Sequence, residues 1–175
     1  PYGTRLTRAE WEAQNVHVDS QDNILEASKS ATKVVAASDA LDGSKAGADY
    51  VCDGTADDVQ IQAAIDALPT SGGSVVLTEG NFSILAAIEI AANNKVLKGQ
   101  GAATTLTAAT DDISVVHIYS AGGVYSTKLE GFYVKGVAKA SYGVDLEHAL
   151  YTRINNVRVD TCKTAGFRLL YNHSN

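Results

Sequence analysis

Two carboxylates and an imidazole lie close together near the end of the sequence. Asp145 and Glu147 alternate with the apolar residues Val144 and Leu146, and His148 follows directly. In a strand with its apolar residues inward, both carboxylates share the outer face, about 7 Å apart. Glycoside hydrolysis uses two carboxyl groups about 5–5.5 Å apart for retention or about 6.5–9.5 Å apart for inversion, and a histidine can carry a proton. These three polar residues are candidate catalytic groups, although any half-exposed strand with a solvated polar face shows the same alternation.

Asp160 is a fourth candidate, because a neighbouring coil can bring it to Asp145 as a cross-coil acidic site. The alternative is a surface ion pair between Asp160 and Lys135, worth at most about 1 kcal/mol. A calcium-dependent lyase would need clustered aspartates, and Asp111-Asp112 is a weak signal for that because sequence neighbours in a strand point to opposite faces. We expect no metal and no cofactor in this chain.

Aromatic residues offer a different chemistry, which is the stacking of sugar rings. Tyr133, Arg158 and Tyr151 are candidate glycan-binding residues. The simpler interpretation of the first two is a structural cation–π pair, in which Tyr133 stacks on Arg158.

One amphipathic helix begins the set of elements that must position these residues. Thr55 stands three residues before Asp58, as in a capping box, and Pro69 ends the pattern. The apolar residues between them recur at helical spacing: Ile61, Ala64, Ile65 and Leu68. The pattern predicts a helix over Thr55–Leu68. Beyond Gly72-Gly73 the period changes to two, which predicts short strands that carry Val75, Leu77, Phe82 and Ile84 on one face.

Repetition in the second half of the chain indicates a solenoid. Leu129-x-x-Phe132-x-Val134 matches Ile154-x-x-Val157-x-Val159 at a spacing of 25, and Gly143–Leu146 matches Gly166–Leu169 at a spacing of 23. A looser copy covers residues 95–118. Since one solenoid turn fits this spacing, residues 75–175 are expected to form roughly four coils.

The chain divides into three regions. Residues 1–33 have a separate texture and are expected to form an N-terminal attachment segment. Residues 34–74 contain two short strands, at 34–37 and 48–52, a polar loop at 38–47 between them, and the helix. Residues 75–175 form the coils, and because the last one reads as a bare strand we expect the solenoid to continue past Asn175.

Composition excludes several classes of protein. The 175 residues are 45% apolar and 19% charged, with a net charge of −6 and no basic patch, so nucleic acid is not an expected partner. No segment approaches the roughly 20 apolar residues of a membrane span, and no signal peptide is visible. Cys52 and Cys162 match no metal-binding spacing, and free thiols are favoured over a disulfide.

The segment that leads into the repeat region resembles a known family. Ala48–Asp58, followed by Ile61-Gln62-Ala63-Ala64-Ile65 and Gly72–Leu77, looks like the start of pectate-lyase-like, right-handed parallel β-helix proteins, among which phage tailspikes are prominent. The sequence departs from many members at Thr78–Phe82, where those carry a Pro-Pro-Gly-Thr-Tyr-like turn. The resemblance implies an all-β, right-handed parallel β-helix with an N-terminal capping α-helix.

The resemblance also implies a function, which the fold alone does not decide. The primary expectation is a virion structural protein of the tailspike or tail-fibre type, forming the particle-proximal part of a spike that recognises a host glycan. Its expected partners are two further copies in a homotrimer, other virion or tail proteins bound through the N-terminal segment, and a cell-surface polysaccharide. The expected location is the virion or the extracellular space. The alternatives are a polysaccharide lyase or glycoside hydrolase, and a structural assembly or adhesin subunit; catalysis within these residues is not expected.

Overall fold

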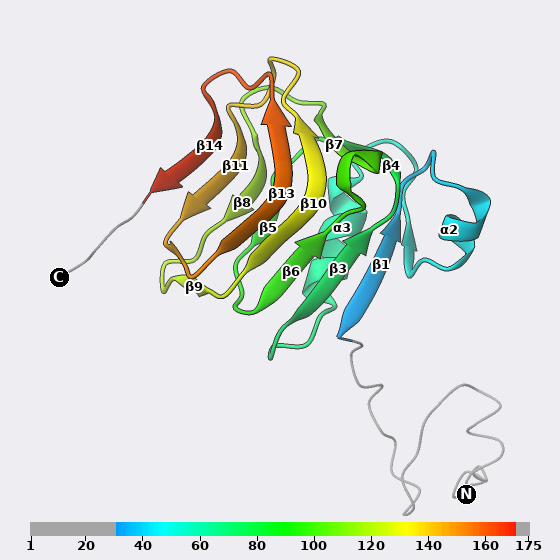
Figure 1. Cartoon of the computed structure of the whole chain (residues 1–175), viewed down its shortest axis with the longest axis horizontal. Coiled ribbons are helices and arrows are strands. Elements are labelled where there is room, and N and C mark those ends of the chain that lie inside the picture. The colour runs from blue at the N-terminus through cyan, green and yellow to red at the C-terminus, as the bar shows by residue number, and fades with distance from the viewer. Residues whose placement is uncertain (1–30, 171–175) are drawn as a thin grey trace, which may run out of the picture.

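The chain forms a parallel β-solenoid of about four turns with few helices. Figure 1 shows this computed structural model, which describes residues 31–170. The expected all-β solenoid is therefore confirmed at this level. Most of the expected attachment segment, 1–33, lies outside the described residues, and its last two residues belong to the first strand. No helix within residues 31–170 is long and apolar enough to cross a membrane.

The largest sheet collects strands from every part of the described chain. Its strands are β1 (Thr32–Ala36), β2 (Tyr50–Val51), β3 (Gly73–Leu77), β4 (Gly80–Ile84), β6 (Lys95–Lys98), β7 (Thr104–Ala108), β10 (Lys128–Lys135) and β13 (Arg153–Asp160). They follow the order β2-β1-β3-β6-β10-β7-β4, and β13 pairs with β10. The strands of this sheet pair in parallel, as stacked coils require.

A second sheet has four parallel strands, one from each successive coil. It contains β5 (Ile88–Ile90), β8 (Ser114–Ile118), β11 (Tyr142–Glu147) and β14 (Ala165–Leu170), in the order β14-β11-β8-β5. A small third sheet pairs β9 (Val124–Tyr125) with β12 (Ala149–Leu150). Figure 1 shows the four-stranded sheet beside the large one, with its strands stacked from green to red.

The strand register confirms the two repeat spacings. Leu129 pairs with Ile154 and Phe132 with Val157, at the spacing of 25. Asp145 pairs with Arg168, at the spacing of 23. The register follows from the core, because a slip by one residue would turn every apolar side chain to the solvent. The inward residues of β10 and β11 are buried, namely Leu129, Phe132, Val134, Val144 and Leu146.

The expected helix forms, but it is shorter than predicted. Helix α3 spans Asp58–Asp66 and packs against β1, β2, β3, β4 and β5, with Ile61, Ala64 and Ile65 buried. Thr55 is not its cap: the residue before the helix is Asp57, whose side chain makes no capping hydrogen bond. The Asp57 carboxylate instead accepts from the backbone N–H groups of Gly54 and Ser83.

Two further short helices interrupt the connections. Helix α2 (Asp42–Ala46) lies within the segment predicted as a polar loop, and η1 (Gly101–Ala103) is one turn of 3₁₀-helix before β7. Leu41, the residue before α2, donates its backbone N–H to the Glu79 carboxylate, and Ser44 donates its hydroxyl to the same oxygen. These long-range contacts stabilise a five-residue helix whose own sequence is a weak helix former.

Candidate functional site

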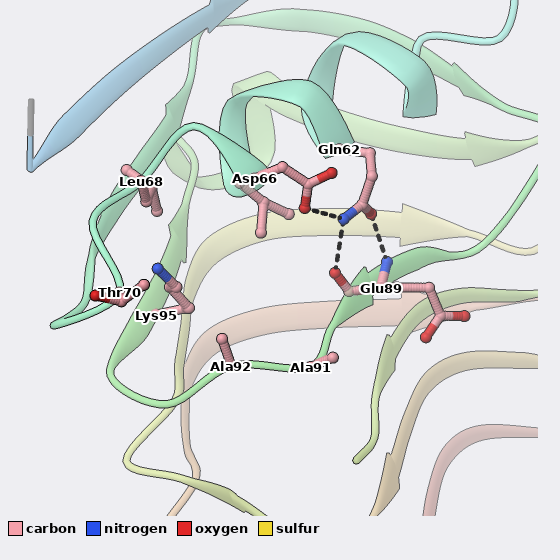
Figure 2. A pocket seen from close by; sticks show the side chains of 9 residues that line it. Gln62, Asp66, Leu68, Thr70, Glu89, Ala91, Ala92 and Lys95 are labelled. Carbon is pink, nitrogen blue, oxygen red and sulfur yellow. Dashed lines mark hydrogen bonds between the residues drawn. The ribbon is translucent and has the colours of Figure 1, made fainter. Parts of the chain in front are cut away.

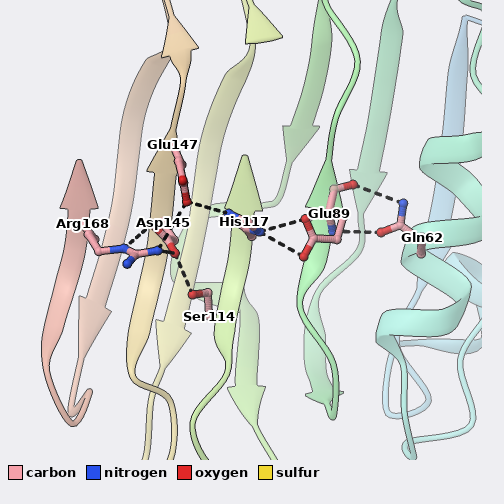
Figure 3. Close-up of polar contacts among 7 residues, drawn as sticks. All are labelled: Gln62, Glu89, Ser114, His117, Asp145, Glu147 and Arg168. Carbon is pink, nitrogen blue, oxygen red and sulfur yellow. Dashed lines mark hydrogen bonds and ion pairs between the residues drawn. The ribbon is translucent and has the colours of Figure 1, made fainter. Parts of the chain in front are cut away.

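A row of polar side chains crosses the four-stranded sheet, one from each strand. Glu89 on β5, His117 on β8, Asp145 on β11 and Arg168 on β14 are register partners. We call these four residues the polar ladder (Figure 3). Because strands of neighbouring coils lie about 4.8 Å apart, the four side chains stack within contact distance of one another. Acidic and basic residues alternate along the row.

Asp145 is buried and ion-paired with Arg168. Its two oxygens accept from Arg168 Nε at 2.7 Å and Arg168 Nη2 at 2.5 Å, and Ser114 Oγ donates to Asp145 Oδ2 at 3.0 Å. The hydrogen bonds to Asp145 raise the pKa of the Arg168 guanidinium. This guanidinium also lies over the Tyr142 ring, 4.4 Å from its centroid. A carboxylate held in this way is a structural acceptor and is poorly placed to give a proton to a substrate.

Glu147 is more open than Asp145 and has looser contacts. Its Oε2 lies 3.8 Å from Arg168 Nη2 and 3.9 Å from His117 Nε2. Figure 3 shows Glu147 above the polar ladder, between these two basic groups. The two candidate catalytic carboxylates therefore lie on one strand but in unlike environments.

His117 is oriented by Glu89. The imidazole Nδ1 lies 3.1 Å from Glu89 Oε1 and 2.9 Å from Glu89 Oε2, which favours a proton on Nδ1 that is donated to this carboxylate. The His117 Nε2 is buried and has no hydrogen-bond partner within the described part of the chain. An imidazole held at one nitrogen, with a carboxylate near the other, is an arrangement that can carry a proton.

Tyr119 completes this face of the sheet. Its ring is stacked with the His117 ring and tilted against the His148 ring, with centroids 5.7 Å apart in both cases. Tyr119 is 37% exposed, so one part of the ring faces solvent while the imidazoles support it. His148 itself lies in the turn after β11, with a positive φ of 52°. We call Tyr119, Glu147 and the polar ladder together the ladder face.

Sequence reasoning missed Glu89, His117, Arg168 and Tyr119. A signal for the first two existed, because Glu89, His117 and Asp145 follow one another at a spacing of 28. The apolar neighbours keep the same spacing, since Ile88 pairs with Val116 and Ile90 with Ile118. The spacings of 25 and 23 come from the last coils, and they do not match the spacing of 28 between the earlier coils.

Three other candidate residues, Tyr133, Arg158 and Asp160, lie on the large sheet. Tyr133 on β10 and Arg158 on β13 are register partners, and the guanidinium carbon lies 4.7 Å from the centroid of the Tyr133 ring. The expected cation–π pair is therefore confirmed. The Tyr133 hydroxyl donates to Asp160 Oδ2, and Thr161 Oγ1 donates to Asp160 Oδ1 at 2.8 Å.

Asp160 does not join Asp145, because the two residues end up on different sheets. The expected ion pair of Asp160 with Lys135 is wrong: the nearest cation is Arg158 Nη2, at 3.7 Å. Lys135 instead places its Nζ 5.3 Å from the centroid of the Tyr133 ring. The Tyr133 ring therefore contacts both cations, Lys135 on its own strand and Arg158 on β13. Tyr151, beyond β12, lies away from this pair and is largely exposed.

A pocket of about 280 Å³ lies between α3 and β5 (Figure 2). Gln62 and Asp66 line it from the helix, Glu89 from the strand, and Lys95 from the start of β6. Lys95 is buried and donates to the Pro69 carbonyl at 2.6 Å. The pocket borders the polar ladder at Glu89.

The remaining candidates for metal or thiol chemistry have structural partners. Asp111 and Asp112 both pair with Lys163, at 3.0 and 2.9 Å. Residues 31–170 contain no group of three or more His, Cys, Asp or Glu side chains arranged to hold a metal ion. Cys52 and Cys162 are free thiols, as expected, and only Cys52 is fully buried.

Comparisons with protein-family models, with curated proteins and with solved structures found no match. The site must therefore be interpreted from its own geometry.

Proposed function

We propose that this chain is part of a tailspike- or tail-fibre-type β-helical protein that binds a host surface glycan, and that the ladder face is the binding surface. The single observation that carries the proposal is the exposed Tyr119 ring, supported by two imidazoles and flanked by Glu147 and the polar ladder.

Sugars present two kinds of surface, and the ladder face has a counterpart to each. The C–H groups of a pyranose ring pack on the face of an aromatic side chain, and Tyr119 offers such a face. The hydroxyl groups bind planar, charged side chains that accept or donate in pairs, which Glu147, Glu89 and Arg168 supply at their exposed edges. Since every residue lies on or beside a strand of one sheet, the surface needs little ordering when a glycan binds.

The finer architecture is part of the same proposal. The coils wind in a right-handed sense, and α3 covers the N-terminal end of the stack. The resemblance of residues 48–77 to pectate-lyase-like proteins supports this, as does the buried apolar side of α3 against β1 and β3. Right-handed crossover is also the general rule for parallel strands. Three copies in a trimer, on a virion or in the extracellular space, complete the proposed assembly.

Catalysis is the second candidate function, and one observation favours it. Glu147 Oε2 lies 3.9 Å from His117 Nε2, which is too far for a direct hydrogen bond, so a substrate hydroxyl or a water between them would have to link the two for proton transfer. The ion pair of Asp145 with Arg168 argues against the two-carboxylate mechanism of glycosidases, since only one of the two carboxyl groups remains available.

Binding of a panel of purified bacterial surface polysaccharides, measured by biolayer interferometry, tests the proposal. We expect Tyr119→Ala to lower the affinity at least tenfold. Tyr125→Ala is the matched control, because Tyr125 is 40% exposed but lies on β9, outside the ladder face. Equal losses in both variants, or no binding to any polysaccharide, would contradict the proposed surface. Release of reducing ends by the wild-type chain but not by Glu147→Gln would favour the enzyme.

A further inference from the structure

The first coil has edge strands whose backbone groups are occupied by side chains. β4 and β5 end the strand orders of their sheets. Along β4, the N–H groups of Asn81 and Ser83 donate to carboxylates, those of Asp39 and Asp57, at 2.9 and 2.8 Å. Just past β4, the Leu85 N–H donates to Asp58 Oδ1 at 2.7 Å.

β5 is covered by an amide. The Glu89 N–H donates to Gln62 Oε1 at 2.9 Å, and Gln62 Nε2 donates to the Glu89 carbonyl at 3.1 Å. With these contacts, the β4 edge of the large sheet and the β5 edge of the second sheet have side-chain partners in place of a neighbouring strand. Such edges do not accept another chain.

The last coil has no such cover within residues 31–170. β13 pairs only with β10, and β14 only with β11. No side chain of the described residues substitutes for a strand along the other edge of residues 153–159 or of β14. The free N–H and C=O groups there are spaced to receive one more parallel strand on each sheet.

The apolar side chains of this coil are equivalent to core residues of the coil below. Ile154 and Leu169 are the register partners of Leu129 and Leu146, which are buried. Leu169, in contrast, is 75% exposed. A hollow of about 240 Å³ lies between Leu146, Tyr151, Ile154 and Leu169, with three further residues around it. The apolar side chains of this surface continue the core of the solenoid. They leave solvent only if further inward-facing apolar residues stack on them.

The charges at this end of the solenoid indicate which outward-facing side chains a docked segment would carry. The polar ladder alternates Glu89, His117, Asp145 and Arg168, so the next position in the row calls for an acid. On the large sheet, Arg158 is 73% exposed at its side chain, and Asp160 is its only partner within ion-pair distance among residues 31–170. Acidic side chains opposite Arg158 and Arg168 would pair with both, since opposite charges directly across strands are favourable.

We propose that the β13–β14 end of the solenoid docks a β-coil segment that runs parallel to these strands, with apolar residues facing inward and carboxylates facing Arg158 and Arg168. The occupant is a polypeptide of this chemistry rather than a second copy of the chain. A head-to-tail copy would have to displace Asp57 and Gln62 from β4 and β5. A copy docked end to end would bring the Arg158 and Arg168 side chains of both copies to the same interface. This inference does not depend on the glycan proposal, because none of the docking residues except Arg168 belongs to the ladder face.

A synthetic peptide with the sequence of residues 141–150 is the probe for this surface. That segment pairs with β14 from the other side in the fold, and it presents Val144 and Leu146 on one face and Asp145 on the other. Binding of the fluorescein-labelled peptide to the whole chain is measured by anisotropy. We expect saturable binding that weakens at least tenfold in Leu169→Lys. Leu41→Lys is the matched control, since Leu41 is 72% exposed and lies beside α2.

The charge requirement has its own comparison. A peptide with Asp145→Lys should bind the wild-type chain at least fivefold more weakly than the unchanged peptide, and added salt should reduce that difference. Absence of binding at 1 mM peptide, or equal binding by Leu169→Lys and the wild type, would overturn the proposal. Sedimentation showing a wild-type dimer that Leu169→Lys dissociates would also overturn it, in favour of a second copy. Glycan binding by Tyr119 is unaffected by either result.

Discussion

The carboxamide of Gln62 stands in for a peptide group beside Glu89. It accepts the Glu89 N–H at 2.9 Å and donates to the Glu89 carbonyl at 3.1 Å, which is the pair of bonds that a neighbouring strand would make. Asp66 Oδ1 holds the same amide nitrogen at 3.0 Å (Figure 2). A helix and a strand edge are thereby joined by one side chain.

Loss of the Gln62 amide should weaken the contact of α3 with β5. We expect Gln62→Ala to lower the free energy of unfolding by about 1 kcal/mol, because two hydrogen bonds are exchanged for bonds to water at a partly exposed position. Urea denaturation followed by circular dichroism measures the change. Val59→Ala, at an exposed position of the same helix, should change stability by less than about 0.5 kcal/mol. A similar effect of both substitutions would show that helix propensity, and not the edge contact, is being measured.

Substitution of Asp57 should lower the free energy of unfolding more than substitution of Gln62. It is fully buried and its two oxygens accept from the N–H groups of Gly54 and Ser83, at 2.9 and 2.8 Å. Asp57→Ala leaves both donors without a partner away from water, and we expect a loss of about 2–4 kcal/mol in unfolding free energy. Asp57→Asn keeps one acceptor oxygen and should lose less. Thermal unfolding of both variants gives the order, and an Asn variant as unstable as the Ala variant would contradict the account.

Breaking the buried ion pair should cost more than removing it altogether. Arg168→Met leaves the Asp145 carboxylate buried with Ser114 as its only side-chain donor in the described part of the chain, and we expect a loss of about 3 kcal/mol in the free energy of unfolding. The double variant Asp145→Leu with Arg168→Met removes the stranded charge, so it should be more stable than Arg168→Met alone. A double-mutant cycle by chemical denaturation measures both, and a double variant less stable than the single one would refute the argument.

The carboxyl of Asp160 should titrate below the usual range for aspartate. Hydrogen bonds from Tyr133 and Thr161 lower its pKa, and Arg158 and Lys135 lower it further. Because the folded pKa lies below the unfolded value of about 3.9, the stabilisation is present above that pH and is lost as the pH falls through the folded pKa. In Tyr133→Phe we expect the Asp160 pKa to rise towards its ordinary value. Carbon-detected NMR titration of the Asp160 carboxyl group in the wild type and in Tyr133→Phe checks this.

The two thiols should differ in reactivity. Burial, and next to it the negative charge of Asp57, raises the pKa of Cys52 to about 12, and burial also raises the pKa of Cys162. At pH 8 we expect Ellman's reagent to label Cys162 slowly and Cys52 only after denaturation, since the thiolate is the reacting form. Rapid labelling of both thiols in the native protein would show that the packing around Cys52 opens easily.

Local patterns in the sequence were sufficient for the strands of the last coils and for their register. The apolar alternation of Leu129-x-x-Phe132-x-Val134 and its copy 25 residues later predicted both strands and their register, because only one register buries every apolar side chain. The Tyr133–Arg158 pair followed from the same alignment. The start of the helix was predicted wrongly at Thr55. The structure begins the helix after Asp57, whose carboxylate accepts from the N–H groups of Gly54 and Ser83, and Ser83 lies 26 residues further along the sequence.

Tertiary structure alone decided which polar residues meet. Asp145 and Asp160 lie 15 residues apart in the sequence, but the turn between β11 and β13 sends them to different sheets. Glu89 and Arg168 lie 79 residues apart, but the stacking of coils places them in one row with His117 and Asp145. The sequence by itself determined the repeat and the inward face, because both depend on local spacing and on burial. The partners of each charge depend on which coils lie side by side, and that is set only when the whole solenoid has folded.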